Sequence, residues 1–148
     1  MARKTRFVGT KLMRNAPPAG FGIDFLVNDD MEIVADVTFD ESKEGDKGIL
    51  HGGAIATVLD EAMGAVAYEN GKPGYTATMT YNYRSHIPLY ETVAIRAWIE
   101  KIDGKKVFAA CTATLTDGTL AVDGTGLFIA SEKLKQHLDA KASEHKDE

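Results

Sequence analysis

The stretch LHGGAIATVLDEAMGAVAYEN, residues 50–70, decides how this chain can fold. Between Ala54 and Tyr68, small and aliphatic side chains occupy almost every position of a helical wheel. A helix that is apolar on all sides must be enclosed by the rest of the protein. Helix-breaking residues follow at 70–74 (NGKPG), so we predict one long buried helix over residues 54–68.

Strand-like runs flank this helix on both sides. Two runs precede it, at 22–28 and 31–39, and a polar loop at 40–48 leads into it. Further runs follow at 75–84, 92–102, 105–116 and 119–131. The last three are joined by Asp103-Gly104 and Asp117-Gly118, which are strong hairpin signals. This order predicts an α+β fold in which a curved antiparallel sheet wraps around one central helix.

Two finer features of the strands can also be predicted. Residues 75–84 alternate in polarity, so Thr76, Thr78, Thr80, Asn82 and Arg84 are expected to share one face. Asp123-Gly124 lies inside the last strand and predicts a β-bulge there.

Composition limits the classes of protein that fit. The chain has 148 residues, of which 44% are hydrophobic, and this suits one folded domain at 21–131 with an N-terminal arm (1–20) and a polar C-terminal tail (132–148). In the tail we expect at most a short, frayed helix. The net charge of −5 argues against a nucleic-acid partner. No apolar run is long enough for a membrane span, and we find no secretory signal.

Cysteine and histidine usage excludes further possibilities. Cys111 is the single cysteine, so it cannot form an internal disulfide, and we expect it to be a small core residue in a reducing cytoplasm. No group of cysteines and histidines has the spacing of a zinc site, so we expect no metal.

The predicted helix carries two adjacent carboxylates, Asp60 and Glu61, among apolar residues. A carboxylate in such surroundings is normally paired, hydrogen-bonded or functional. Their directions differ by about 100° around the helix, so at least one should face a polar partner. Both could lie on an exposed stripe or in a salt bridge; alternatively, one could be a general base or nucleophile.

The tripeptide His51-Gly52-Gly53 lies immediately before this helix. Two glycines at a helix N-terminus leave backbone N–H groups accessible, and the helix dipole there favours negative charge. An oxyanion hole has this arrangement, but so does an ordinary glycine-rich turn. We interpret His51 primarily as a structural histidine that bonds its own loop, and keep it as a catalytic candidate.

The spacing of these features leads to a prediction about assembly. Gly53 and Asp60 are seven residues apart, which is about 10 Å along a helix. A base and an oxyanion donor must both lie within a few ångströms of one carbonyl, so a single helix cannot easily supply both. Two antiparallel copies could, so if both features act together, the sequence predicts a site shared across a two-fold dimer.

Basic residues that could bind an anionic ligand are few in this acidic chain. Asn82 and Arg84 lie on the predicted polar face of strand 75–84, with Arg84 about 27 Å of strand from Thr76. Lys101, Lys105 and Lys106 flank the Asp103-Gly104 turn. These lysines could bind phosphate, or they could only keep a hairpin tip soluble.

These motifs together resemble a known family. Residues 50–64 (LHGGAIATVLDEAMG), 76–89 (TATMTYNYRSHIPL) and 124–131 (GTGLFIAS) resemble hotdog-fold acyl-CoA thioesterases of the phenylacetate-degradation type. The likeness is nearest to the branch that includes mammalian thioesterase superfamily members, and it covers residues 20–131. It implies a hotdog fold, a dimer that often pairs into a tetramer, and a site at the dimer interface.

The resemblance also implies roles for individual residues. Asp60 matches the catalytic carboxylate, and Thr76 the hydroxyl that positions the water or that carboxylate. Gly52 matches the glycine whose N–H polarises the thioester carbonyl, with Gly53 beside it. Positions where relatives touch coenzyme A correspond to Asn82, Arg84, Lys105 and Lys106. Coenzyme A is then part of the substrate, and neither a metal nor another cofactor is implied.

One position departs from the family pattern. Many relatives carry asparagine six residues before the histidine, where it helps to hold the attacking water, but this chain has Gly45. We expect Asp60 to depend more on Thr76 as a result. Hydrolysis of an acyl-CoA thioester is therefore the predicted function. The alternatives are a non-hydrolytic acyl-CoA-binding module and, less in keeping with a histidine outside the helix, a dehydratase or hydratase.

Overall fold

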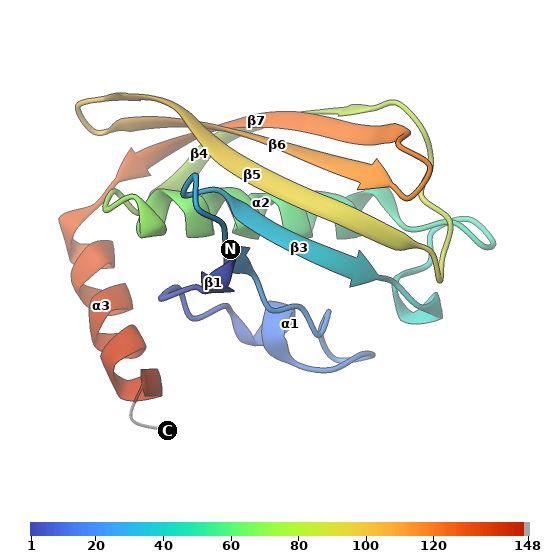
Figure 1. Ribbon diagram of the computed structural model, residues 1–148, viewed down its shortest axis with the longest axis horizontal. Helices are drawn as coiled ribbons and strands as arrows, with labels where there is room; N and C mark the ends of the chain where they lie inside the picture. Colours follow the sequence, from blue (N-terminus) through green and yellow to red (C-terminus); the bar gives the residue numbers. More distant parts are fainter. Residues whose placement is uncertain (147–148) are drawn as a thin grey trace.

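A computed structural model describes residues 1–146 and contains one seven-stranded sheet with a long helix packed on it (Figure 1). All neighbouring strands are antiparallel, in the order β1-β2-β3-β5-β6-β7-β4. The strands are β1 (Arg3–Lys4), β2 (Leu26–Val27), β3 (Ile33–Thr38), β4 (Gly74–Tyr83), β5 (Thr92–Asp103), β6 (Lys106–Leu115) and β7 (Leu120–Ala130). The helices are α1 (Lys11–Arg14), the 3-10 turn η1 (Glu41–Lys43), α2 (Gly52–Glu69) and α3 (Glu132–Lys146).

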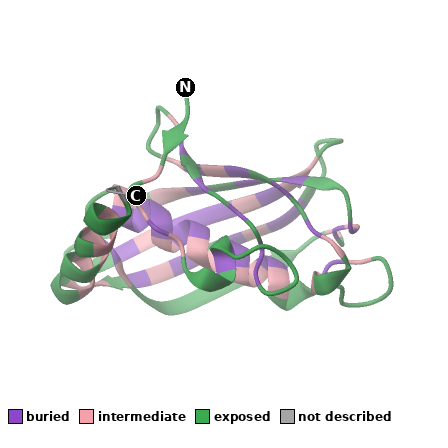
Figure 2. Cartoon of the chain, turned by 90° about the horizontal axis from the view of Figure 1, so that it is seen from below, coloured by how far each residue is buried: buried purple, intermediate pink, exposed green. Residues whose placement is uncertain are grey.

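Helix α2 forms the centre of the core, as its all-round apolar sequence predicts. It contacts five strands, β3 to β7, and half of its 18 residues are buried (Figure 2). Val58, Leu59, Ala62 and Met63 are completely inaccessible to solvent. Cys111 is also buried and free, as expected for a small core residue. The α+β prediction, with the sheet around one helix, is confirmed.

Strand β4 is the outer edge of the sheet and is almost entirely exposed. It pairs with β7 on one side, and its other side carries backbone groups available for pairing. The register shifts between Thr76 and Thr78, which leaves Ala77 as a bulged residue. The predicted alternation over the whole strand is therefore wrong. Thr76 points toward α2, on the same face as Tyr81 and Tyr83, whereas Thr78 and Asn82 point away from it.

The bulge predicted at Asp123-Gly124 is not present. Both residues pair regularly with β6 and β4, and the irregularity on the β6 side comes earlier, next to Ala113. Glycine is needed at 124 for space instead, because a Cβ there would lie 2.5 Å from the Tyr81 ring.

The two ends of the chain are more ordered than expected. The N-terminal arm contributes β1 and α1, and the segment expected to hold at most a short, frayed helix forms the 15-residue helix α3 beside α2 (Figure 1). Tyr68 of α2 donates a hydrogen bond of 2.8 Å to Asp139 of α3. Within residues 1–146, no helix combines the length and apolar character needed to cross a membrane.

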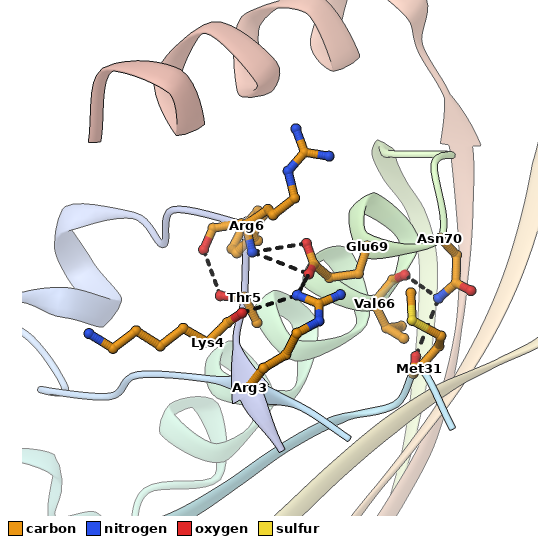
Figure 3. A network of polar contacts seen from close by, with 9 residues as sticks. Arg3, Lys4, Thr5, Arg6, Met31, Val66, Glu69 and Asn70 are labelled. Carbon is orange, nitrogen blue, oxygen red and sulfur yellow. Dashed lines mark hydrogen bonds and ion pairs between the residues drawn. The ribbon is translucent and has the colours of Figure 1, made fainter. Parts of the chain in front are cut away.

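Two glutamates of α2 hold the N-terminal arm. Both carboxylate oxygens of Glu69 accept from the backbone N–H of Arg6 at 3.2 Å, and one also accepts from the Arg3 guanidinium (Figure 3). Glu61 accepts from Thr10 N–H at 3.0 Å and from its hydroxyl at 2.8 Å. These contacts fasten residues 3–10 along one face of α2.

Candidate active site

Asp60 lies midway along α2 and faces the edge strand. The Thr76 hydroxyl donates a hydrogen bond of 2.8 Å to Asp60 Oδ1. Asp60 is half-buried, and its Oδ2 has no hydrogen-bond partner among residues 1–146. The bulge at Ala77 is what turns Thr76 toward the helix. One oxygen is thus oriented by the protein, and the other is left to accept a proton or to attack.

The first turn of α2 presents one backbone N–H without an acceptor. The amides of Ala54 and Ile55 donate to the His51 carbonyl, and Gly53 N–H donates to His51 Nδ1 at 2.9 Å. Gly52 N–H has no acceptor in the part of the chain that the structure describes. Since Gly53 N–H is occupied, Gly52 is the candidate oxyanion donor at the positive end of the helix dipole. His51 is the N-cap, as its structural interpretation predicts.

A cavity of about 340 Å³ opens beside Gly52. Its inner wall is apolar, with Leu50, Ile55, Ile87 and Val122, while Arg84, Ser85 and His86 form a polar rim. The Tyr83 ring also lines it, and the Tyr83 hydroxyl donates to the Gly52 carbonyl at 2.9 Å. An elongated ligand with an apolar part could therefore reach the Gly52 amide from this side.

Gly45 cannot be replaced by asparagine without a rearrangement. A Cβ at this position would lie 2.9 Å from the His51 Cα, which is closer than real Cβ atoms approach backbone. The loop around Gly45 therefore lies too close to the N-terminus of α2 to hold an amide side chain. Among the described residues, the hydroxyl of Thr76 is what orients Asp60.

Two predicted binding residues direct their side chains to Asp123 of β7. Asn82 Nδ2 donates to Asp123 at 2.8 Å, and the Arg84 guanidinium forms an ion pair with the same carboxylate. These two donors hold the pKa of Asp123 below its usual value. The prediction that Asn82 and Arg84 share a face with Thr76 is wrong, because the bulge reverses the alternation between them.

The three lysines gather at the opposite end of β4 from Arg84. Lys106 pairs with Ile129, which pairs with Tyr75 at the start of β4. Lys101 lies over the Phe108 ring, 5.8 Å from its centroid, and Lys105 is in the two-residue turn. None of the three forms an ion pair with a described residue. Within one chain, the lysines and Arg84 thus lie at separate ends of the sheet.

Sequence reasoning missed two contacts in this region. Tyr81 and Tyr83 donate hydroxyl hydrogen bonds to the carbonyls of Ala56 and Gly52, one helical turn apart. Burial raises the pKa of both phenols, so they remain donors. Their aromatic alternation was visible in the sequence, but only the strand register shows which carbonyls they reach.

A long central helix within a curved antiparallel sheet, with an acid midway along it that a hydroxyl orients, is the arrangement of one class of protein: the hotdog-fold proteins. The comparison with known families agrees, because residues 47–122 match the thioesterase superfamily model, and the chain belongs to this family. The crystal structure of another thioesterase superfamily protein superposes with a TM-score of 0.73 at 28% identity, over 75% of this chain and 55% of that one. The hotdog fold and the family resemblance are thus confirmed.

Curated relatives carry more specific names. Acyl-coenzyme A thioesterase THEM4 of Rattus norvegicus is 40% identical over 87 residues, covering 58% of this chain and 37% of that protein. Acyl-coenzyme A thioesterase 13 of Mus musculus is 30% identical over 109 residues, covering 72% of this chain and 73% of that protein. The chain therefore spans well under half the length of the rat relative that it matches.

Proposed function

We propose that this protein hydrolyses acyl-CoA thioesters to the free acid and coenzyme A. The observation that carries the proposal is Asp60, a half-buried carboxylate midway along the central helix, with one oxygen oriented by Thr76 and the other available. The names of its relatives support the substrate class. The reaction consumes water and an acyl-CoA and calls for no metal or additional cofactor.

The active site is shared between two subunits in this proposal. Gly52 and Asp60 are eight residues apart on α2, about 12 Å along the axis, so they cannot act on one carbonyl within one chain. The exposed edge of β4 is suited to pairing antiparallel with a second β4. About a two-fold axis near Met79, Thr76 of one strand comes close to Tyr83 of the other.

This pairing brings the two halves of the chemistry together. Thr76 holds Asp60, and Tyr83 holds Gly52, so the acid of one subunit approaches the helix N-terminus of its partner. Two-fold symmetry then produces two equivalent sites. The family resemblance favours a further association of such dimers into a tetramer, and the single buried cysteine favours the cytoplasm.

In the reaction, the thioester carbonyl oxygen accepts from Gly52 N–H, where negative charge develops as the carbon becomes tetrahedral. Asp60 of the other subunit either takes a proton from an attacking water or attacks directly to give an anhydride that water then opens. The C–S bond breaks, and the departing thiolate receives a proton. Direct attack places Asp60 Oδ2 at the reacting carbon, whereas the general-base route places it one water molecule away.

The coenzyme A moiety would bind along the ends of the sheet. In the two-fold dimer, the lysine hairpin of one subunit lies toward the Arg84 end of its partner. Lys101, Lys105 and Lys106 carry no ion pair with a described residue, and they can contact phosphate groups of the nucleotide. Asn82 and Arg84 would contribute after rearranging their contacts with Asp123.

Thiol release from a panel of short, medium, long and aryl acyl-CoAs tests the proposal. We expect turnover by the wild-type protein and its loss in Asp60→Asn, measured with a thiol reagent in the visible range. Binding of acyl-CoA without thiol release, seen by calorimetry, would instead indicate a non-hydrolytic binding module. A hydrated or dehydrated acyl product would indicate the hydratase alternative.

A further inference from the structure

The peptide that joins Gly52 to Gly53 is held at both ends by side chains. Its carbonyl oxygen accepts from the Tyr83 hydroxyl at 2.9 Å, and its N–H donates to His51 Nδ1 at 2.9 Å. The preceding peptide is held through the His51 carbonyl, which accepts from Ala54 and Ile55. Both peptide planes on either side of the Gly52 Cα are therefore fixed.

Two consecutive glycines make this restraint necessary. Glycine has more backbone freedom than any other residue, and helix ends fray when their first turn is poorly held. Gly52 and Gly53 are both exposed, so little packing supports them. An oxyanion donor is effective only when its direction is fixed before the charge develops. A contact that fixes Gly52 can thus affect catalysis without touching the reacting carbon.

Tyr81 offers an internal comparison on the same two elements. Its hydroxyl lies 3.2 Å from the Ala56 carbonyl, one turn further along α2, and 3.1 Å from Met79 Sδ. Ala56 lies well inside the helix, and neighbouring residues of that turn are buried in the core. Loss of the Tyr81 hydroxyl therefore removes a similar hydrogen bond without releasing the glycine turn.

We propose that Tyr83 is a positioning residue, whose hydroxyl fixes the Gly52–Gly53 peptide so that Gly52 N–H is directed at the thioester carbonyl. The proposal rests on the proposed function of the preceding subsection. It makes the edge strand hold both halves of the chemistry, since Thr76 of β4 orients Asp60 and Tyr83 of β4 orients Gly52.

The test compares Tyr83→Phe with the matched control Tyr81→Phe, using an acyl-CoA that the wild-type protein hydrolyses. Both variants keep the ring and remove one hydroxyl. For Tyr83→Phe we expect kcat to fall about tenfold, with KM changed less than about twofold, because the donor is misdirected while binding surfaces remain. For Tyr81→Phe we expect a lower melting temperature and a kcat within about twofold of wild type.

Two further readouts separate positioning from general stability. The Gly53 amide should exchange with deuterium faster in Tyr83→Phe than in the wild type, because its peptide is released. The acid limb of the pH–rate profile should keep its position, because the Tyr83 hydroxyl that is removed carries no charge at acid pH.

Several results would overturn the proposal. A wild-type kcat in Tyr83→Phe would show that the hydroxyl is not needed, and a raised KM alone would make Tyr83 a substrate contact. An equal loss of kcat in Tyr81→Phe would mean that any loosening of α2 has this effect. If Asp60→Asn hydrolyses as fast as the wild type, the proposed function itself fails, which is a separate outcome.

Discussion

The carboxylates on the two sides of helix α2 differ in how many of their oxygens accept hydrogen bonds. On the side of the N-terminal arm, Glu61 has both oxygens occupied by Thr10, and Glu69 accepts three hydrogen bonds from Arg3 and Arg6 (Figure 3). On the side of the edge strand, Asp60 accepts one hydrogen bond among the described residues, from Thr76. The number of occupied oxygens thus distinguishes Glu61 and Glu69, which hold the N-terminal arm, from Asp60, which keeps one oxygen available.

Burial alone would point to the wrong residue. The Glu69 side chain is only 1% exposed, yet both of its oxygens already accept hydrogen bonds from the N-terminal arm. Asp60 and Glu61 are both half-buried and adjacent in sequence. A carboxylate that meets a reactant must keep an oxygen available, at a cost in solvation that the rest of the fold offsets.

The largest effect is expected when the adjacent acids Asp60 and Glu61 are each replaced by the corresponding amide. Asp60→Asn should lower kcat by about 10²- to 10⁴-fold with little change in KM, because the general base or nucleophile is lost. Glu61→Gln should change kcat less than about threefold and lower the melting temperature by a few degrees, since the amide still accepts from Thr10. Steady-state thiol release and thermal denaturation measure both.

An equal loss of kcat in the two variants would refute the distinction between the two sides. Unchanged secondary structure by circular dichroism in Asp60→Asn is the control that the loss is chemical. Any residual activity should be independent of residue 61, so the double variant should match Asp60→Asn in kcat.

The second test removes the buried acid on the arm side. Glu69→Ala removes a solvent-inaccessible carboxylate and leaves the Arg6 N–H and the Arg3 guanidinium without this acceptor. We expect a loss of about 2 kcal/mol in the free energy of unfolding, or roughly 6 °C in melting temperature. Urea denaturation measures this loss. The control is Glu91→Ala, which replaces an exposed glutamate and should change the free energy of unfolding by less than about 0.5 kcal/mol. Equal midpoints for the two variants would contradict a fastening role.

The third test concerns the hydroxyl on the edge-strand side. Thr76→Val keeps the shape of the side chain and removes the donor to Asp60, so we expect kcat to fall about tenfold, while Thr76→Ser retains most activity. Thr78→Val is the matched control, because Thr78 points away from α2. Comparable losses at the two positions would show that the bulge does not separate their roles.

That bulge marks the limit of what the sequence could predict. The helix, the hairpins and the order of elements followed from local signals, such as Asp103-Gly104 and the breakers after residue 69. The faces on which Thr76 and Arg84 lie could not be predicted in this way. The unpaired residue Ala77 reverses the period-two alternation of the strand, and no glycine or proline marks its position in the sequence. A shift of one residue moves every later side chain to the other face.

The different hydrogen-bond partners of Asp60 and Glu61 also could not be predicted from the sequence. What occupies Glu61 is Thr10, which is 51 residues away in the chain, and no local pattern links the two. The resemblance to thioesterases named Asp60 as the candidate acid, but it left Glu61 without a role. The structure shows that role, because Glu61 accepts hydrogen bonds from Thr10 and so holds the N-terminal arm on α2.

The smallest expected effect is a pH dependence on the arm side, at the contact between α2 and α3. Tyr68 donates to Asp139, and this hydrogen bond, with a second from Lys135, holds the pKa of Asp139 below its usual value. Burial raises the pKa of Tyr68 to about 12, so its hydroxyl remains a donor at ordinary pH. The folded protein thus binds the Asp139 proton more weakly than the unfolded chain does.

The sign of the effect follows from that difference. A carboxylate with a lowered pKa in the folded state adds stability above its unfolded pKa, about 3.9, and loses it as the pH falls through the folded value. Tyr68→Phe should therefore be less stable than the wild type at pH 6, with a gap that narrows by pH 3, as measured by urea midpoints. In an Asp139→Asn background the gap should become independent of pH, because the group that titrates is gone. A gap that widened in acid would mean that another carboxylate governs this side of the helix.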